Sequence, residues 1–314
     1  MMELNHNIKK QIHFTRIDGV PLIEPNPDLD WEAGGVFAPA VIHENGIWKM
    51  LYRAYGVDKI SRLGYAESYD GIKWQKDINP RVIPDKTGLE YSGIEDPRIV
   101  KIDDRYLVTY TAYADRKKYS QTRIRILETK DFYKFKHITP FFQRQWHKND
   151  KDGVLFPEKI NGLYYMLHRL EPDIQLSSSK NLKRWTKYST VLSPTKNDWE
   201  SLKIGGGAPP IRTSIGWLVF YHGVSNDKKY SMGAAILDIQ TLTKVLYRLP
   251  FPILSPEFFY EEHGVVPNVV FGTSVIELVA NYRIYYGAGD DVVASALIDK
   301  ECLLKTIVQY PINK

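Results

Sequence analysis

Short apolar segments alternate with turn residues along most of this chain, and this pattern is typical of β-strands. The first three strands are predicted at residues 37–42, 48–53 and 63–68. Gly46 marks a turn between the first two, and Asp70 with Gly71 forms a hairpin signal before Trp74. The pattern therefore predicts a compact antiparallel unit at the start of the chain.

The same order of elements recurs four more times. Each copy carries a proline near its first predicted strand, and these prolines are spaced about 52 to 60 residues apart: Pro39, Pro97, Pro157, Pro209 and Pro267. The first strands are predicted at residues 37–42, 96–100, 156–160, 208–211 and 266–270. Short strands in a repeat of this size indicate a β-propeller, so we predict an all-β, five-bladed β-propeller. A β-sandwich also contains many short strands, but it would not explain the regular spacing.

Two regions follow from this repeat. Residues 1–30 are predicted to be an irregular N-terminal arm, because Pro21, Pro25 and Pro27 interrupt any element near its end. Residues 31–314 are predicted to form a single five-bladed catalytic domain. In a propeller the first strand of each blade lines the central channel, so residues near the five prolines would meet at one mouth.

Composition narrows the class of protein. The 314 residues are 43% hydrophobic and 25% charged, which suits one large globular domain or two small ones. The net charge is +5, but the basic residues are spread out, which argues against nucleic acid and favours bound anions. Cys302 is the single cysteine, which excludes an intrachain disulfide and a cysteine-based metal cluster.

The sequence says less about the cellular location of the protein and about its partners. Residues 1–10 are polar and lack the apolar segment of a secretory signal. No apolar run is long enough to span a bilayer. We therefore expect a cytoplasmic protein without a membrane partner, and the sequence leaves open whether it forms a homo-oligomer.

The segment from Gly93 to Val100 carries the clearest catalytic candidate. Glu95 and Asp96 precede Pro97, and the residue before a proline is biased toward an extended backbone. Asp96 is therefore predicted to lie stiffly at the entrance of a strand, where a reactive carboxylate is useful. The alternative is a strand-entry residue that bonds nearby backbone or pairs with Arg98.

Polar residues that depart from the repeat would gather at the same mouth. They are Arg53, Glu95, Asp96, Arg98, Lys151, Asp152, Glu158, His168, Arg169, Lys203, His222, Tyr230 and Asp290. Each cation could instead be a solvated surface charge. His168 and His222 could be hydrogen-bonded core histidines, and Glu158 could neutralise Lys159 or Arg169.

This set of residues fits cleavage of a glycosidic bond. The leaving oxygen needs a proton donor, and a hydrolase normally needs a second carboxylate for water. Phosphate is already an anion and needs cations to hold it instead of a base. One acid beside a cluster of Lys, Arg and His therefore favours an inverting phosphorylase, with inorganic phosphate as co-substrate and no metal or organic cofactor.

Several motifs resemble the β-mannoside phosphorylases of glycoside hydrolase family 130, over about residues 30–300. The matching segments are residues 93–98, 155–162, 166–169, 221–223 and 285–290. The resemblance implies a five-bladed β-propeller and a glycosyltransferase-type reaction that cleaves β-mannosides by phosphorolysis with inversion. The product implied is α-mannose 1-phosphate.

The resemblance also assigns roles by motif. Asp96 matches the family's catalytic acid, and the resemblance implies that its proton reaches the glycosidic oxygen through a substrate hydroxyl. The phosphate-binding candidates are Lys151, Arg169, Lys203, His222 and Tyr230. The substrate-binding candidates are Arg53 and Asp290, which match contacts to the transferred mannosyl unit, with Glu95, Arg98, Asp152, Glu158 and His168.

One departure from the family pattern concerns the sugar. Many members have Asn before the first proline, where this chain has Ala38. The linkage (β-1,2 or β-1,4), the acceptor sugar and the physiological direction therefore stay open. The alternatives are a β-mannosidase of the same fold, with Glu158 as its second carboxylate, and a carbohydrate-binding propeller without catalysis.

Overall fold

The computed structural model describes residues 12, 14–17, 19–85, 88–116, 119–138, 149–186, 188–196 and 198–312. Strands dominate these residues and helices are few, so the predicted all-β class is confirmed. Two short helices, α2 (Phe259–Glu262) and α3 (Lys300–Ile307), were not predicted. Neither described helix has the length and apolar character needed to cross a membrane.

The strands form five antiparallel groups. The first contains β2 (Gly35–Glu44), β3 (Ile47–Tyr55), β4 (Ser61–Ser68) and β5 (Gln75–Lys76). The second contains β6 (Gly93–Ile102), β7 (Arg105–Arg116), β8 (Tyr119–Thr129) and β9 (Lys136–Ile138). The third contains β10 (Lys151–Leu155), β11 (Tyr164–Leu170), β12 (Asp173–Ser179) and β13 (Ser189–Leu192).

The remaining two groups complete the set. The fourth contains β14 (Lys203–Gly206), β15 (Ile211–Thr213), β16 (Gly216–Val224), β17 (Tyr230–Leu237) and β18 (Val245–Arg248). The fifth contains β19 (Val270–Glu277), β20 (Asn281–Ala288), β21 (Val292–Asp299) and the N-terminal strand β1 (Phe14–Arg16). One parallel pair, Ser61 with Gly93, links the first two groups into one sheet.

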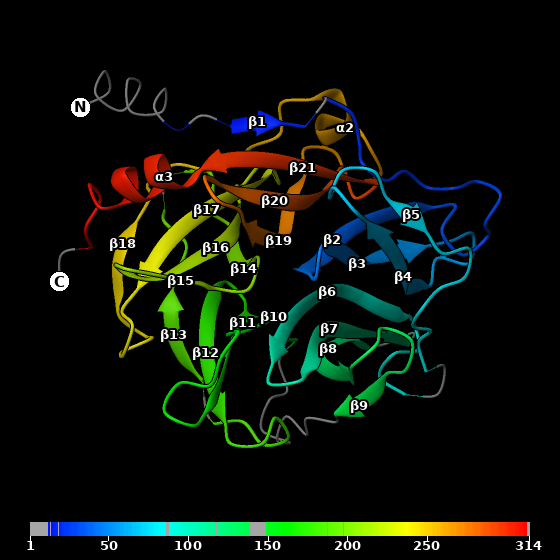
Figure 1. Cartoon of the computed structure of the whole chain (residues 1–314), viewed down its shortest axis with the longest axis horizontal. Helices are drawn as coiled ribbons and strands as arrows, with labels where there is room; N and C mark the ends of the chain where they lie inside the picture. The colour runs from blue at the N-terminus through cyan, green and yellow to red at the C-terminus, as the bar shows by residue number, and fades with distance from the viewer. Residues whose placement is uncertain are drawn as a thin grey trace.

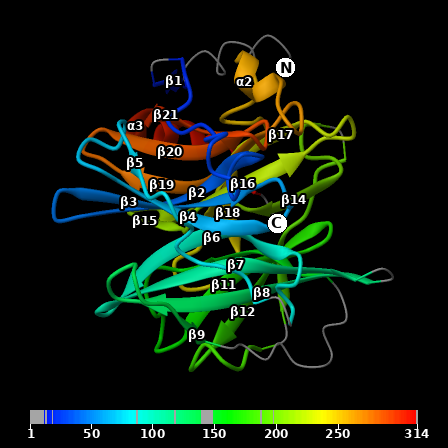
Figure 2. The same ribbon diagram turned by 90° about the vertical axis from the view of Figure 1, so that its right-hand side faces the viewer.

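The five groups lie around the middle of the molecule, with β2, β6, β10, β14 and β19 on their inner sides (Figure 1). Among these inner strands, β19 contacts β2, β2 contacts β6, and β10 contacts both β6 and β14. In the side view of Figure 2, β19, β20 and β21 lie toward one end of the molecule, and β8, β9 and β12 lie toward the other. Residues far apart in sequence therefore meet at the inner strands.

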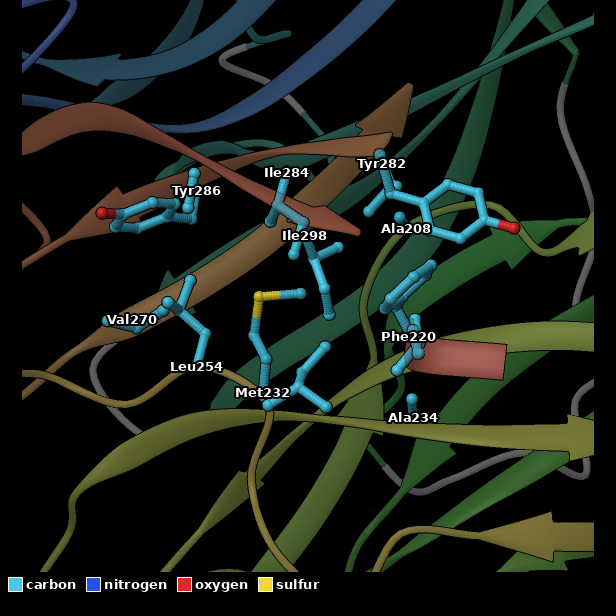
Figure 3. Packing of buried hydrophobic residues seen from close by; sticks show 14 of the residues in the cluster. Ala208, Phe220, Met232, Ala234, Leu254, Val270, Tyr282, Ile284, Tyr286 and Ile298 are labelled. Carbon is cyan, nitrogen blue, oxygen red and sulfur yellow. The ribbon is translucent and has the colours of Figure 1, made fainter. Parts of the chain in front are cut away.

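Apolar clusters join each group to the next. Separate clusters lie between the first and second groups, the second and third, the third and fourth, the fourth and fifth, and the fifth and first. In the fourth-to-fifth cluster, Phe220 and Met232 pack with Tyr282 and Ile284 (Figure 3). Gly272 permits this packing, because a Cβ there would lie 2.1 Å from the Met232 sulfur.

The predictions of the first strand were correct in the first two copies and wrong in the last three. β10 and β14 end before Pro157 and Pro209, and β19 begins after Pro267. The ladder between β10 and β11 shifts register between Lys151 and Val154, as the ladder between β6 and β7 does between Glu95 and Arg98. The structural counterpart of Pro97 is therefore Gly153, and the last three prolines lie in connecting segments.

The N-terminal strand β1 lies within the predicted irregular arm, of which residues 1–11, 13 and 18 are outside the described part. β1 pairs with β21. Arg16 of β1 donates from Nε and Nη2 to the two carboxylate oxygens of Glu261, at 2.7 and 2.9 Å. Glu261 is fully buried and also accepts from the Tyr286 hydroxyl and two backbone N–H groups. This buried pair fastens β1 to helix α2, and through Tyr286 to β20.

Glu261→Gln should lower the free energy of unfolding by roughly 3–5 kcal/mol, because it leaves the Arg16 guanidinium without its buried counter-charge. Denaturant unfolding would measure the loss. The matched control is Glu257→Gln, which removes the exposed carboxylate 3.0 Å from Nη1 of the same arginine and should cost less than about 1 kcal/mol. Equal losses of stability in the two variants would contradict the role of Glu261 as the main counter-charge of Arg16.

Candidate active site

A cavity of about 190 Å³ opens at the inner strands and receives side chains from all five groups. The lining residues are Phe37, Arg53, Asp96, Lys151, Asp152, Arg169, His222, Tyr230, Val266, Val269, Phe271 and Asp290. Most of the candidates named from the sequence therefore share one cavity.

Backbone bulges place two of the carboxylates. Ala38, Asp96 and Asp152 occupy corresponding positions in β2, β6 and β10, where each ladder shifts register, and all three have left-handed backbones with φ of 46°, 51° and 54°. The extended backbone predicted for Asp96 is therefore wrong, because the bulge overrides the bias imposed by Pro97. Bulges redirect side chains and are common beside active sites, and Asp tolerates this conformation better than most residues.

Asp96 belongs to a network of charges on one side of the cavity. Arg53 donates from Nη1 to Asp96 Oδ1 at 3.1 Å and from Nη2 to Glu95 Oε1 at 2.7 Å. Lys151 donates to the other Glu95 oxygen at 2.9 Å. Glu95 is thus a buried bridge between the two cations and supports the site from outside the cavity lining.

Asp290 completes this acidic side. Burial raises the pKa of Asp290 from 3.8 to about 6, although the nearby Arg53 guanidinium opposes the shift. The Asp290 carboxyl therefore changes its protonation state in mildly acidic solution. Phe37, whose ring lies 4.7 Å from the Arg53 guanidinium carbon, covers the same arginine.

Arg169 organises the other side of the cavity. Its Nη1 lies 3.0 Å from Asp152 Oδ2 and 3.3 Å from His222 Nε2, and its Nη2 lies 3.5 Å from Glu171 Oε1. Burial alone would raise the pKa of Asp152, but Arg169 and neighbouring groups lower it to about 2. Asp152 is therefore ionised near neutral pH and holds Arg169 in place.

His222 differs from its predicted role as a positive charge. Burial lowers its pKa from 6.5 to about 3, so the imidazole is neutral near pH 7. Its Nδ1 is buried and has no hydrogen-bond partner among the described residues. Gly205 makes room for the ring, because a Cβ there would lie 2.4 Å from His222 Cε1 and 2.5 Å from Asp152 Oδ2. His222 thus offers a hydrogen bond instead of a charge.

Lys203 lies beside this cavity and not on its lining. It lines an adjoining cavity of about 410 Å³ that shares Tyr230 and Val266 with the first. Its ammonium donates to Glu171 Oε1 at 3.0 Å. Glu171, the shared partner of Lys203 and Arg169, was not among the predicted residues.

Three other predicted residues do not reach the cavity. Arg98 is buried and donates to the carbonyl oxygens of Asp96, Gly206 and Gly207 at 2.8 to 3.0 Å. Glu158 is on the surface and pairs with Arg212. The predicted direct contacts of these residues with substrate are therefore not supported by their positions.

His168 is the third of these residues. Its ring lies between Asp150, at 3.1 Å, and Ser177, at 3.0 Å. The order Ser, His, Asp resembles a hydrolytic triad, but Ser177 is only 1% exposed and cannot meet a substrate. The cluster instead ties together the inner strands of the third group, which carry Lys151 and Arg169. The alternative interpretation of His168 as a hydrogen-bonded core residue fits its position.

The apolar wall of the cavity was not predicted from the sequence. Phe37, Ala38, Val269 and Phe271 form a small cluster beside it. The Phe271 ring lies 4.8 Å from the His222 ring, edge to face. The only sequence signal was that Phe37 precedes Ala38, the position that departs from the family pattern. Among the described residues, no group of three or more His, Cys, Asp or Glu side chains could hold a metal ion.

Comparisons with known proteins give one consistent family. The model of glycoside hydrolase family 130, described as beta-1,4-mannooligosaccharide phosphorylase, matches residues 23–309. The 1,2-beta-oligomannan phosphorylase of Thermoanaerobacter sp. (strain X514) is 38% identical over 92% of this chain and 98% of its own.

Solved structures agree with the sequence relatives. The beta-1,2-mannobiose phosphorylase of Listeria innocua, in complex with beta-1,2-mannobiose, has a TM-score of 0.83 at 28% identity, over 94% of this chain and 99% of that one. A second solved structure has a TM-score of 0.83 at 26% identity, over 92% of this chain and 94% of that one. Its description says that this family of mannoside phosphorylases contains glycoside hydrolases that target beta-1,2 mannosidic linkages in Candida mannan.

Asp290→Asn should change how stability depends on pH. Because the folded-state pKa of Asp290 is raised to about 6, its contribution is complete below about pH 3.8 and is lost as pH rises through 6. The Asn variant should therefore gain up to about 3 kcal/mol relative to the wild type between pH 4 and pH 7. Denaturant unfolding across this range measures the difference. A difference that stays constant with pH would show that Asp290 ionises normally.

Proposed function

The chain belongs to glycoside hydrolase family 130, and on that basis we propose that it cleaves a β-linked mannoside with inorganic phosphate, with inversion, releasing α-mannose 1-phosphate. The observation that carries this proposal is one cavity with a carboxylate side around Asp96 and a cationic side around Arg169. A phosphorolysis needs both sides, an acid for the leaving oxygen and cations for the attacking anion. Mannosyl transfer to phosphate makes the reaction a glycosyltransferase-type one.

We assign the roles by position in the cavity. Asp96 supplies the proton, and Arg53 and Asp290 hold the mannosyl unit beside it. Arg169 is the main phosphate ligand, with Lys203 approaching from the adjoining cavity. In an inverting reaction the nucleophile attacks from the face opposite the leaving group, and this requirement fits an acid and a cationic cluster that come from different groups of strands.

Three further candidates assist the phosphate. Lys151 adds charge, because Glu95 and Asp96 outweigh the effect of burial and raise its pKa. Tyr230 and the neutral His222 add hydrogen bonds. The Arg169 guanidinium keeps its charge, since Asp152 and Glu171 outweigh burial and raise its pKa.

The fold proposed for this activity is a single five-bladed propeller over residues 31–314, with β1 of the N-terminal arm added as the outer strand of the fifth blade. Its support is the ring of five apolar clusters, in which the fifth group packs on the first. Each group would be one blade, and the cavity would lie where the inner strands converge. The bulges at Asp96 and Asp152 then direct side chains from two blades into that space.

Hydrolysis is the competing function, because the family includes hydrolases. The carboxylate first considered as its base, Glu158, pairs with Arg212 away from the cavity. Asp152 is engaged by Arg169. A hydrolase would therefore have to use Asp290 for water, while its cationic cluster stayed without a role.

One experiment separates these functions and addresses the linkage. Purified protein is incubated with β-1,2- and β-1,4-mannobiose, each with and without phosphate, and mannose and mannose 1-phosphate are quantified. We expect mannose 1-phosphate only with phosphate present, and the better substrate identifies the linkage. Free mannose at equal rates with and without phosphate would establish the hydrolase, and no cleavage would favour a carbohydrate-binding protein.

Asp96→Asn should lower turnover by about 10²- to 10⁴-fold, the usual contribution of general acid catalysis, and leave the fold intact. Steady-state phosphorolysis and circular dichroism would be compared with the wild type. A folded variant with near-normal turnover would reduce Asp96 to a structural residue. Loss of turnover in Asp290→Asn but not in Asp96→Asn would move the acid role to Asp290.

Arg169→Ala should raise the KM for phosphate by about 10- to 100-fold, since a hydrogen bond to a charged partner contributes roughly 1.5–3 kcal/mol. The KM for the mannoside should change much less. Kinetics with each substrate varied in turn would measure both constants, and Arg212→Ala, an exposed arginine, serves as the control. If mannoside binding is lost while the phosphate KM is unchanged, the cationic cluster is misassigned.

A further inference from the structure

Glu171 occupies a distinctive position beside the cationic cluster. The ladder of β11 and β12 pairs Leu170 with Asp173, so Glu171 and Pro172 form a two-residue turn. The Pro172 carbonyl accepts a hydrogen bond from Ile204 of β14 at 3.0 Å. This hydrogen bond holds the turn next to Lys203. The backbone of Glu171 is therefore fixed beside the two cations.

One oxygen of Glu171 contacts both cations that we assign to phosphate. Oε1 lies 3.0 Å from Lys203 Nζ and 3.5 Å from Arg169 Nη2. A phosphate oxygen that bridged the same two cations would need the space that Oε1 fills. Carboxylate and phosphate oxygens make the same type of charge-assisted hydrogen bond, so the two anions would compete for one place.

The two carboxylate partners of Arg169 differ in how easily they can be displaced. Asp152 contacts Nη1 from inside the protein, and its side chain is 2% exposed. Glu171 contacts Nη2 from outside, and its side chain is 59% exposed. An exposed carboxylate regains water when it leaves its partner, and exposed ion pairs are weak. Asp152 is therefore the fixed partner of Arg169 and Glu171 the exchangeable one.

We propose that Glu171 is a resident counter-ion that occupies the outer side of the Arg169–Lys203 pair until phosphate displaces it, and that it thereby sets the affinity for phosphate. This inference rests on the proposed phosphorolysis. The lowered pKa of Glu171 agrees with this proposal. Burial raises the pKa, but the opposite effect of Lys203 and Arg169 is larger, so the carboxylate is ionised at neutral pH. Glu171 is a positioning residue here, because it acts through the two cations.

The test is Glu171→Gln, which keeps the shape of the side chain and removes its charge. Loss of a competing anion should lower the KM for phosphate about two- to fivefold, the range expected for one exposed ion pair. The KM for the mannoside should stay within experimental error. Calorimetric titration with inorganic phosphate, without mannoside, should show the same decrease in Kd.

Glu257→Gln is the matched control. Glu257 is likewise an exposed carboxylate, 66% exposed, that contacts a mostly buried arginine at 3.0 Å, and it lies outside both cavities. The Glu257→Gln substitution changes the net charge of the protein by the same amount as Glu171→Gln. Its KM and Kd for phosphate should equal those of the wild type, which separates a local effect from a general gain of positive charge.

The outcomes distinguish this inference from the function on which it rests. A wild type that binds phosphate and forms mannose 1-phosphate, with Glu171→Gln binding phosphate more tightly, supports both. If the wild type is active but Glu171→Gln binds phosphate equally well or more weakly, Glu171 supports the cations and the inference is overturned. A wild type that neither binds phosphate nor forms mannose 1-phosphate overturns the proposed function itself.

Discussion

Each group of strands buries much of its apolar surface against its two neighbours, and this constraint governs the rest of the structure. The five clusters between groups run from the first to the fifth and back to the first. Close packing at every interface fixes the angle between neighbouring groups. The inner strands are thereby held at set positions, and the cavity is the space that remains between them.

Within this frame, the buried guanidinium of Arg98 joins the inner strands of different groups. It donates to the carbonyl of Asp96 in β6 and to those of Gly206 and Gly207 at the end of β14. It also lies 3.5 Å from Asp152 of β10. Satisfying backbone carbonyls with a charged donor stabilises the irregular backbone that a bulge creates. The two carboxylate residues at the bulges, Asp96 and Asp152, are thus both held by the same side chain.

The sequence was sufficient where a property repeats and insufficient where it depends on three-dimensional surroundings. The strand repeat predicted the all-β class and the proximity of Arg53, Asp96, Arg169 and His222. It did not predict the left-handed backbone of Asp96, because a ladder shift is a property of two paired strands. It also gave His222 a charge that burial removes, since burial depends on neighbours distant in the sequence. Glu171 was missed because its contacts with Arg169 and Lys203 join residues of two different groups of strands.

The pairing of β1 with β21 has a consequence for how the molecule folds. The two strands lie at opposite ends of the described chain, so their ladder closes a loop that contains nearly every other element. Such long-range pairings form late, because the entropy of loop closure opposes them until the intervening elements are in place. An intermediate with an unpaired β21 would expose a strand edge, which is prone to associate with other chains. The yield of refolded protein should therefore depend more on protein concentration than on the stability of any single group of strands.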